Sequence, residues 1–240
     1  MRKQYGTSLI ELMIASTIGL FLILGLGTVF YSMRQTSIAR QGLSTLQNNE
    51  RLAMTFLTTS IRGAGFYTFS INPGVIISPS TQFPAVPSSF TQGQSIFGTT
   101  NGGTADTLSV RFVTPPLGAP GTLIQGCSAG LIASTPYTDT YSIQPSLPGV
   151  PVTNDLVCTE NGVAYHLIAG IQGMSVLYGI DTSPTHIGSV TEYVPASGVT
   201  NWANVKTVSI TLLFSNPLSG TPNQPQTVSF SMTAPYMNGL

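Results

Sequence analysis

The chain has 240 residues, a formal net charge of zero and 7% charged residues. It contains no basic cluster that could neutralise a phosphate backbone, so its composition argues against nucleic-acid binding. Beyond residue 62 the Lys and Arg residues are Arg111 and Lys206 alone, and a surface this poor in charge and rich in Ser, Thr, Asn and Gln is typical of exported proteins.

The first predicted element is an apolar helix near the N-terminus, in which residues 12–33 carry no charge. A helix of 22 residues spans about 33 Å, which is enough to cross a hydrocarbon core of about 30 Å. A six-residue leader with two basic residues precedes it, and Glu11 lies at its start. The junction that fits cleavage, Gly6 to Thr7, comes before the apolar run. Unlike a secretory signal, the helix would therefore be retained.

The sequence GTSLIEL at residues 6–12 resembles the processing site of type IV prepilins. The shared features are a short basic leader, a glycine, a carboxylate five residues further on and a long apolar run. The resemblance implies that a prepilin peptidase cuts after Gly6 and methylates the new N-terminus at Thr7, where the family usually has phenylalanine. The alternative is a plain signal anchor, in which Gly6 and Glu11 have no special role.

Glu11 is the residue that points to assembly. A carboxylate in an apolar span costs free energy, up to about 2.5–3.5 kcal/mol at the bilayer centre. The free amine of a neighbouring subunit, created by the cut before Thr7, is a natural partner for it. The resemblance implies that Glu11 sets the register of subunits in a bundle of pilin helices. The alternative is a Glu11 that lies at headgroup depth and stays hydrated.

A helical pattern continues beyond the apolar run, with apolar residues that recur about once per helical turn and charged residues between them. The apolar residues are Ile38, Leu43, Leu46, Leu52, Phe56, Leu57 and Ile61. We expect one helix over residues 7–62, apolar all round in its first half and amphipathic in its second. Gly63 and Gly65 are expected to end it.

The rest of the chain is predicted to be rich in β-structure. Residues 63–105 have no charge and several prolines, so we expect loop there with one or two short strands. Asn161-Gly162 predicts a two-residue hairpin. Alternating apolar residues predict further strands at residues 108–112, 174–178, 208–214 and 228–232. We expect an antiparallel sheet over the second half of the helix, and a helical turn at residues 199–205 that buries Trp202.

Longer blocks narrow the resemblance to the PilW-type minor pilins. They are the helix as far as SIRGAGFY at residues 60–67, LIAGIQGMSVLYGIDT at residues 167–182 and VTNWANVKTVSITLLFS at residues 199–215. The fold this implies is a type IV pilin-like α+β fold, with a long N-terminal α-helix, an antiparallel β-sheet head and long loops. The expected parts are a leader (1–6), a transmembrane or filament-core half-helix (7–33), an amphipathic half-helix (34–65) and an extracytoplasmic head (66–240).

The resemblance implies a minor pilin that takes part in type IV pilus assembly, in a priming or tip complex, after peptidase cleavage. Its partners would be other minor pilins, the major pilin, the prepilin peptidase, the inner membrane and a tip adhesin. The precursor would lie in the inner membrane with its head in the periplasm, and the mature protein in the pilus at the cell surface. The alternatives are a type II secretion pseudopilin, and a membrane-anchored adhesin or binding module that uses the loops of residues 66–155.

Cys127 and Cys158 lie in the region expected outside the membrane, where a cysteine pair is first interpreted as a disulfide. It would close a loop of about 30 residues and contribute about 3–4 kcal/mol. The alternative is two free, buried thiols. We expect no metal, because a second cysteine pair or a histidine cluster would be needed to complete four ligands. No cofactor is expected either.

The sequence does not predict a catalytic site. His166 and His186 are the side chains that could act as a base near neutral pH. His166 lies in an alternating strand, where a hydrogen-bonded or exposed histidine is the simpler interpretation, and His186 lies in a loop of Ser, Pro and Thr. No serine lies in a nucleophile-elbow pattern. A structural or binding protein is therefore favoured over an enzyme.

Overall fold

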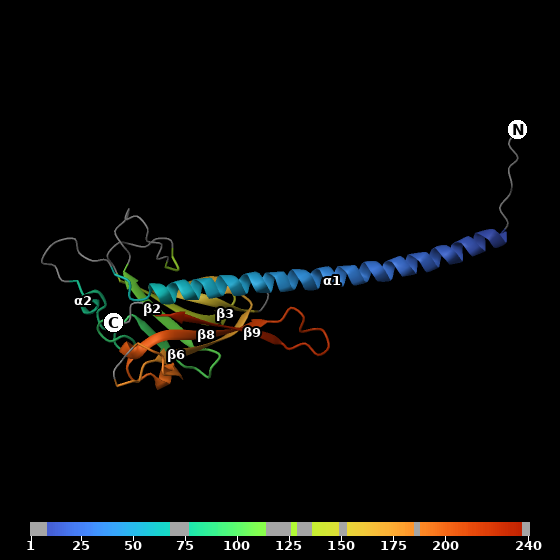
Figure 1. The fold of residues 1–240 in the computed structure, drawn as a ribbon. Coiled ribbons are helices and arrows are strands. Elements are labelled where there is room, and N and C mark those ends of the chain that lie inside the picture. The colour runs from blue at the N-terminus through green and yellow to red at the C-terminus, as the bar shows by residue number, and fades with distance from the viewer. Residues whose placement is uncertain are drawn as a thin grey trace. The chain divides into compact units, whose positions relative to one another are not determined.

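The computed structural model describes residues 9–67, 77–113, 126–128, 136–148, 153–184 and 188–236. The elements in chain order are α1 (Leu9–Gly63), α2 (Pro79–Gln82), β1 (Ile96–Thr99), β2 (Thr107–Val113), β3 (Pro136–Pro145), β4 (Asn154–Glu160), β5 (Val163–Ala169), β6 (Ile171–Ile180), β7 (Glu192–Pro195), η1 (Ala196–Gly198), η2 (Trp202–Asn204), β8 (Val205–Ser215) and β9 (Thr227–Pro235), as drawn in Figure 1. The chain divides into two compact units, Met1–Thr45 and Leu46–Leu240. The second unit therefore combines the end of α1 with all the strands.

Helix α1 ends close to the predicted position. The backbone N–H of Phe66 donates to the carbonyl of Gly63 at 3.0 Å. Gly65 has φ 77°, a left-handed conformation that glycine adopts without steric cost. Its N–H donates to the carbonyl of Arg111 on β2 at 2.7 Å, so the end of the helix is tied directly to the sheet.

The strands form two antiparallel sheets, in the orders β1-β2-β3-β4-β5 and β7-β6-β8-β9. The α+β fold class is confirmed, although the sequence pattern suggested one sheet. The change of sheet occurs at Gly170, between β5 and β6, which has φ 87°. Its N–H donates to Asn154 in the first sheet and its carbonyl accepts from Ser215 in the second. A turn that joins two sheets leaves the alternation within each strand unchanged, so alternation could not reveal it.

The predicted hairpin is confirmed, with Asn161 and Gly162 at φ 49° and 85° between β4 and β5. This pair of positive φ angles is the reason for the Asn-Gly preference in tight hairpins. The predicted helical turn is present as η2. Trp202 in this turn is half-buried rather than fully buried, and its ring lies 4.9 Å from that of Tyr178 and 5.3 Å from that of Phe97.

One apolar core joins the end of α1 to both sheets. The buried residues of α1 are Leu46, Ala53, Leu57 and Ile61. The stripe expected from the sequence was partly wrong, because Leu52 and Phe56 are 43% and 42% exposed. Small side chains, Ala53 and Ala64, take buried positions instead. In Figure 1 this part of α1 lies against the strands.

Arg111 on β2 holds the segment that contains α2. It is 2% exposed, and its guanidinium lies 5.4 Å from the ring centre of Phe83 and 5.0 Å from that of Phe90. One Nη donates to the carbonyl of Pro84 at 2.8 Å. Burial lowers the pKa of the guanidinium. Cation–π contacts and carbonyl acceptors therefore solvate this charge in place of water.

Candidate functional site

The apolar part of α1 is the first candidate site. Of the described helices, α1 alone is long and apolar enough to cross a membrane. Three of its hydroxyl groups are satisfied within the helix, since those of Ser16, Thr17 and Thr28 donate to carbonyls three residues earlier at 2.8–2.9 Å. A helix whose hydroxyls are bonded in this way can enter an apolar environment without leaving donors unpaired.

Glu11 lies in the first turn of α1, between Ile10 and Leu12, which are 65% and 67% exposed. A negative charge in this position interacts favourably with the positive end of the helix dipole. No ion-pair partner for Glu11 is present among the described residues. Gly6 and Thr7 lie outside the described residues. Cleavage at this junction and the registry role of Glu11 therefore stay predictions.

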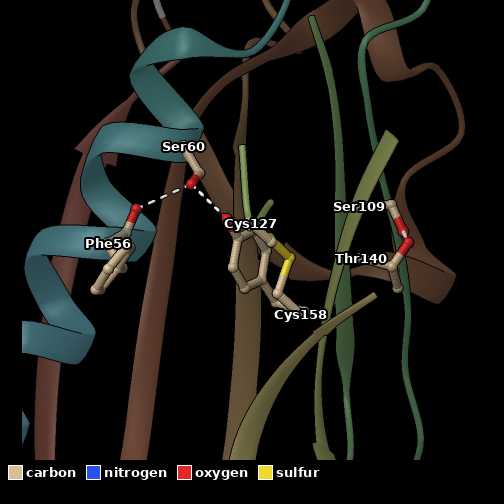
Figure 2. Close-up of a disulfide and its surroundings, with 7 residues drawn as sticks. Phe56, Ser60, Ser109, Cys127, Thr140 and Cys158 are labelled. Carbon is tan, nitrogen blue, oxygen red and sulfur yellow. Dashed lines mark hydrogen bonds between the residues drawn. A yellow bond between two sulfur atoms is a disulfide. The ribbon is translucent and has the colours of Figure 1, made fainter. Parts of the chain in front are cut away.

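The predicted disulfide between Cys127 and Cys158 is present, with a Cα–Cα distance of 6.1 Å. Cys158 lies on β4 opposite Tyr141 on β3. The Tyr141 hydroxyl lies 3.7 Å from Cys127 Sγ and forms a 2.6 Å hydrogen bond with Ser60 of α1. Figure 2 shows Ser60 pointing from the helix towards the disulfide. The disulfide therefore lies where α1 packs on the first sheet.

A metal site at this position does not fit the donor set. Ligand atoms of Cys127, Asp139 and Cys158 lie within 4.8 Å of one another. The two sulfur atoms are bonded to each other, so neither can act as a thiolate ligand. One carboxylate remains from the cluster, which falls short of the four donors that a zinc site needs.

His166 is paired in a way that does not support hydrolase chemistry. Its Nδ1 lies 2.8 Å from Oδ2 of Asp155, and Ser146 donates to the other carboxylate oxygen. The carboxylate thus lies between the serine and the histidine. A serine triad needs the imidazole next to the hydroxyl, so this order provides no base for Ser146. His186 lies outside the described residues.

Most acidic residues beyond α1 are buried. The buried ones are Asp106, Asp139, Asp155, Glu160 and Asp181, whereas Glu192 is exposed. Asp106 accepts hydrogen bonds from the backbone of Val176 at 3.0 Å and of Asn101 at 2.8 Å. Asp181 accepts one from Gly188 at 2.8 Å. Asp106 and Asp181 thus fix the backbone of neighbouring loops, and the burial of all five carboxyl groups leaves the outside of the strands poor in charge.

A cleft of about 410 Å³ lies between residues 79–96 and residues 200–203. Its lining includes Trp202, Tyr236 and several amide and hydroxyl side chains, with no charged group among the described residues. The side-chain amide of Gln94 forms hydrogen bonds within its own loop: its oxygen accepts from the Thr91 N–H, and its nitrogen donates to the Ile96 carbonyl. The cleft is therefore lined by neutral groups, and its described residues include no acid, base or nucleophile pair that could activate a substrate.

Two family models match the chain. Residues 1–27 match the prokaryotic N-terminal methylation motif, and residues 140–238 match the type IV pilus-assembly protein W family, PilW. Over residues 140–238 the chain is similar to the PilW family. No curated protein and no solved structure matches it. The PilW match begins within β3 and continues through β9. It therefore covers part of β3, strands β4 and β5, and the whole second sheet.

The PilW match and the methylation motif confirm the resemblance seen in the sequence. The PilW family is a pilus-assembly family of structural pilins rather than of enzymes. The methylation motif together with the apolar helix indicates a membrane-anchored precursor that becomes associated with the pilus.

Sequence reasoning missed two buried features of the first sheet, namely Arg111 and the contact between Asp139 and Glu160. The only signal for the second was the alternation Tyr137, Asp139, Tyr141, in which an acid occupies a position on the buried face.

Proposed function

We propose that this chain is a minor pilin of the complex that primes type IV pilus assembly and lies at the pilus tip. The observation that carries the proposal is the presence of both matches in one chain, the methylation motif at residues 1–27 and the PilW region at residues 140–238. A type II secretion pseudopilin would share the helix, but the PilW match favours the pilus. Other minor pilins, the major pilin, a tip adhesin and the prepilin peptidase are the proposed partners.

The proposal divides the chain by task. The leader (1–6) is removed, residues 7–33 lie in the inner membrane and later in the filament core, and residues 34–65 carry the head (66–240). Before assembly the head lies in the periplasm, and afterwards at the cell surface. The supporting observations are the exposed apolar side chains of α1 before residue 34 and the buried stripe after residue 45.

We expect protein extracted from membranes to begin at an N-methylated Thr7. The physical reason is that Gly6 offers the peptidase a position without a side chain at the membrane surface, ahead of the apolar run. N-terminal sequencing and intact mass would measure it. A chain that still begins at Met1, or that begins after residue 33, would contradict the proposal.

Glu11→Ala is expected to insert normally but to enter pili about tenfold less well than the wild type, the factor that corresponds to about 1.4 kcal/mol. Removal of the carboxylate makes the helix more apolar, so insertion is retained. It also leaves the amine of the neighbouring subunit without its counter-ion. The measurement is the amount of the variant in sheared pili, relative to that in membranes, in a strain that lacks the wild-type gene.

Glu50→Ala is the matched control, because it removes a carboxylate from the same helix outside the apolar run. Its incorporation should equal that of the wild type. If Glu11→Ala also entered pili as well as the wild type, the proposed ion pair between Glu11 and the N-terminal amine of the neighbouring subunit would be contradicted. A gene-deletion strain that keeps its pili and loses protein secretion would instead support the pseudopilin alternative.

A further inference from the structure

Two acidic side chains, Asp139 on β3 and Glu160 on β4, face each other inside the head. They are register partners in the antiparallel pairing of these strands. Asp139 is 1% exposed and Glu160 is 4% exposed. On each strand the residue two positions away, Tyr141 or Cys158, belongs to the contact between the first sheet and α1. We call Asp139 and Glu160 the carboxyl pair.

The carboxyl pair lacks the partners that buried charges normally have. Both oxygens of Asp139 and Oε1 of Glu160 are buried without a hydrogen bond of normal geometry among the described residues. The flanking register positions hold Val110 on β2 and Val163 on β5, neither of which offers a polar group.

No basic side chain compensates the carboxyl pair within the described part of the chain. The groups that act on Asp139 are Glu160 and the backbone N–H of Cys127. The Tyr141 hydroxyl also interacts with Asp139, and its pKa is raised by burial and by the charge of Asp139. On α1, Arg62 is exposed and does not contribute. The carboxyl groups of Asp139 and Glu160 must therefore serve as hydrogen-bond partners for each other.

Two carboxylates in contact inside a protein cannot both ionise at low cost. A single proton between them creates an O–H···O⁻ hydrogen bond, which is among the stronger types in proteins. We propose that Asp139 and Glu160 share one proton, and that this shared proton joins β3 to β4 beneath the end of α1. The carboxyl pair is then a proton-binding site whose contribution to the stability of the head is greatest in acid.

The electrostatic environment supports this proposal. The pKa of Asp139 is raised from its ordinary value of 3.8 to about 8, first by burial, then by the charge of Glu160 and by their side-chain contact. The N–H of Cys127 acts in the opposite direction and is outweighed. Because the folded-state pKa lies above the unfolded value, the folded state holds the proton more tightly. The stabilisation is complete below about pH 4 and is lost as the pH rises to about 8.

The test compares unfolding of the full chain in detergent micelles at several pH values. Between about pH 5 and pH 7, the wild type should release one more proton on unfolding than Asp139→Asn does. Its unfolding equilibrium constant should therefore rise about tenfold more per pH unit than that of the variant. Glu192→Gln, which removes an exposed carboxylate, should keep the wild-type profile.

Infrared spectroscopy gives a second readout that does not depend on a stable variant. At pH 6 the wild type should show the carbonyl band of a protonated carboxyl group, and the double variant Asp139→Asn/Glu160→Gln, which removes both carboxyl groups, should lack it. Identical pH profiles in the wild type and Asp139→Asn, or no such band in the wild type, would overturn the proposal. So would Ca²⁺ that stabilises the wild type at pH 8 but not Asp139→Asn, because the carboxyl pair would then be a cation site.

Discussion

Loss of the Cys127–Cys158 disulfide is expected to lower the free energy of unfolding of the head by about 3–4 kcal/mol. The two cysteines are 31 residues apart in the sequence, and in the chain-entropy model a cross-link over that distance restricts the unfolded chain by this amount. The double variant Cys127→Ala/Cys158→Ala tests this prediction. Alanine is chosen over serine because serine would place an unpaired hydroxyl at the fully buried Cys158 position.

The measurement is urea unfolding of the full chain in detergent, followed by the fluorescence of Trp202. Trp202 is the single tryptophan of the chain and packs on Tyr178 in the second sheet, so its signal reports unfolding of the head. Reduction of the wild type should reproduce the loss, and reduction of the double variant should change nothing. Equal stability of wild type and double variant under oxidising conditions would contradict a stabilising role.

Leu57→Ala is expected to destabilise the head by about 3 kcal/mol, within the range of about 2–5 kcal/mol for a buried leucine. Leu57 is fully buried in the core that α1 forms with both sheets. Its neighbour Thr58 contacts Met232 of β9, and Ser60 bonds to Tyr141 of β3. A cavity at Leu57 therefore weakens the attachment of the helix to both sheets.

Leu52→Ala is the matched control for this prediction. It is the same substitution, five residues earlier in the same helix, at a side chain that is 43% exposed. We expect a loss below about 1 kcal/mol, since little apolar area leaves the core. The same urea titration measures both variants. Similar losses in the two would show that the buried stripe of α1 has been assigned incorrectly.

Strong local patterns made much of this fold predictable. The uncharged run of residues 12–33 predicted an apolar helix, and Asn161-Gly162 predicted a tight hairpin that needs two positive φ angles. The cysteine pair predicted a disulfide because two isolated cysteines in an exported chain have few other uses. Each of these signals depends on neighbouring residues or on residue type alone.

Features that depend on distant contacts were not predictable. Strand β3 was not predicted from the sequence because Asp139 interrupts the apolar alternation between Tyr137 and Tyr141. The four-residue β7 was too short to show a pattern. Ala53 is buried while Leu52 is not, because Ala53 lies seven residues after Leu46 and four before Leu57, on the face of α1 that packs on the sheets. Hydrophobicity alone ranks these two residues in the opposite order.

The burial of most acidic residues in the head has a consequence for its contacts. Beyond α1, only Glu192 is an exposed acid, and Arg111 is buried while Lys206 is half-buried. Mobile ions weaken binding by screening surface charges, and this surface has few charges to screen. Partners that attach to the strands of this head would be held by shape and neutral hydrogen bonds, with an affinity that changes little between fresh water and brine.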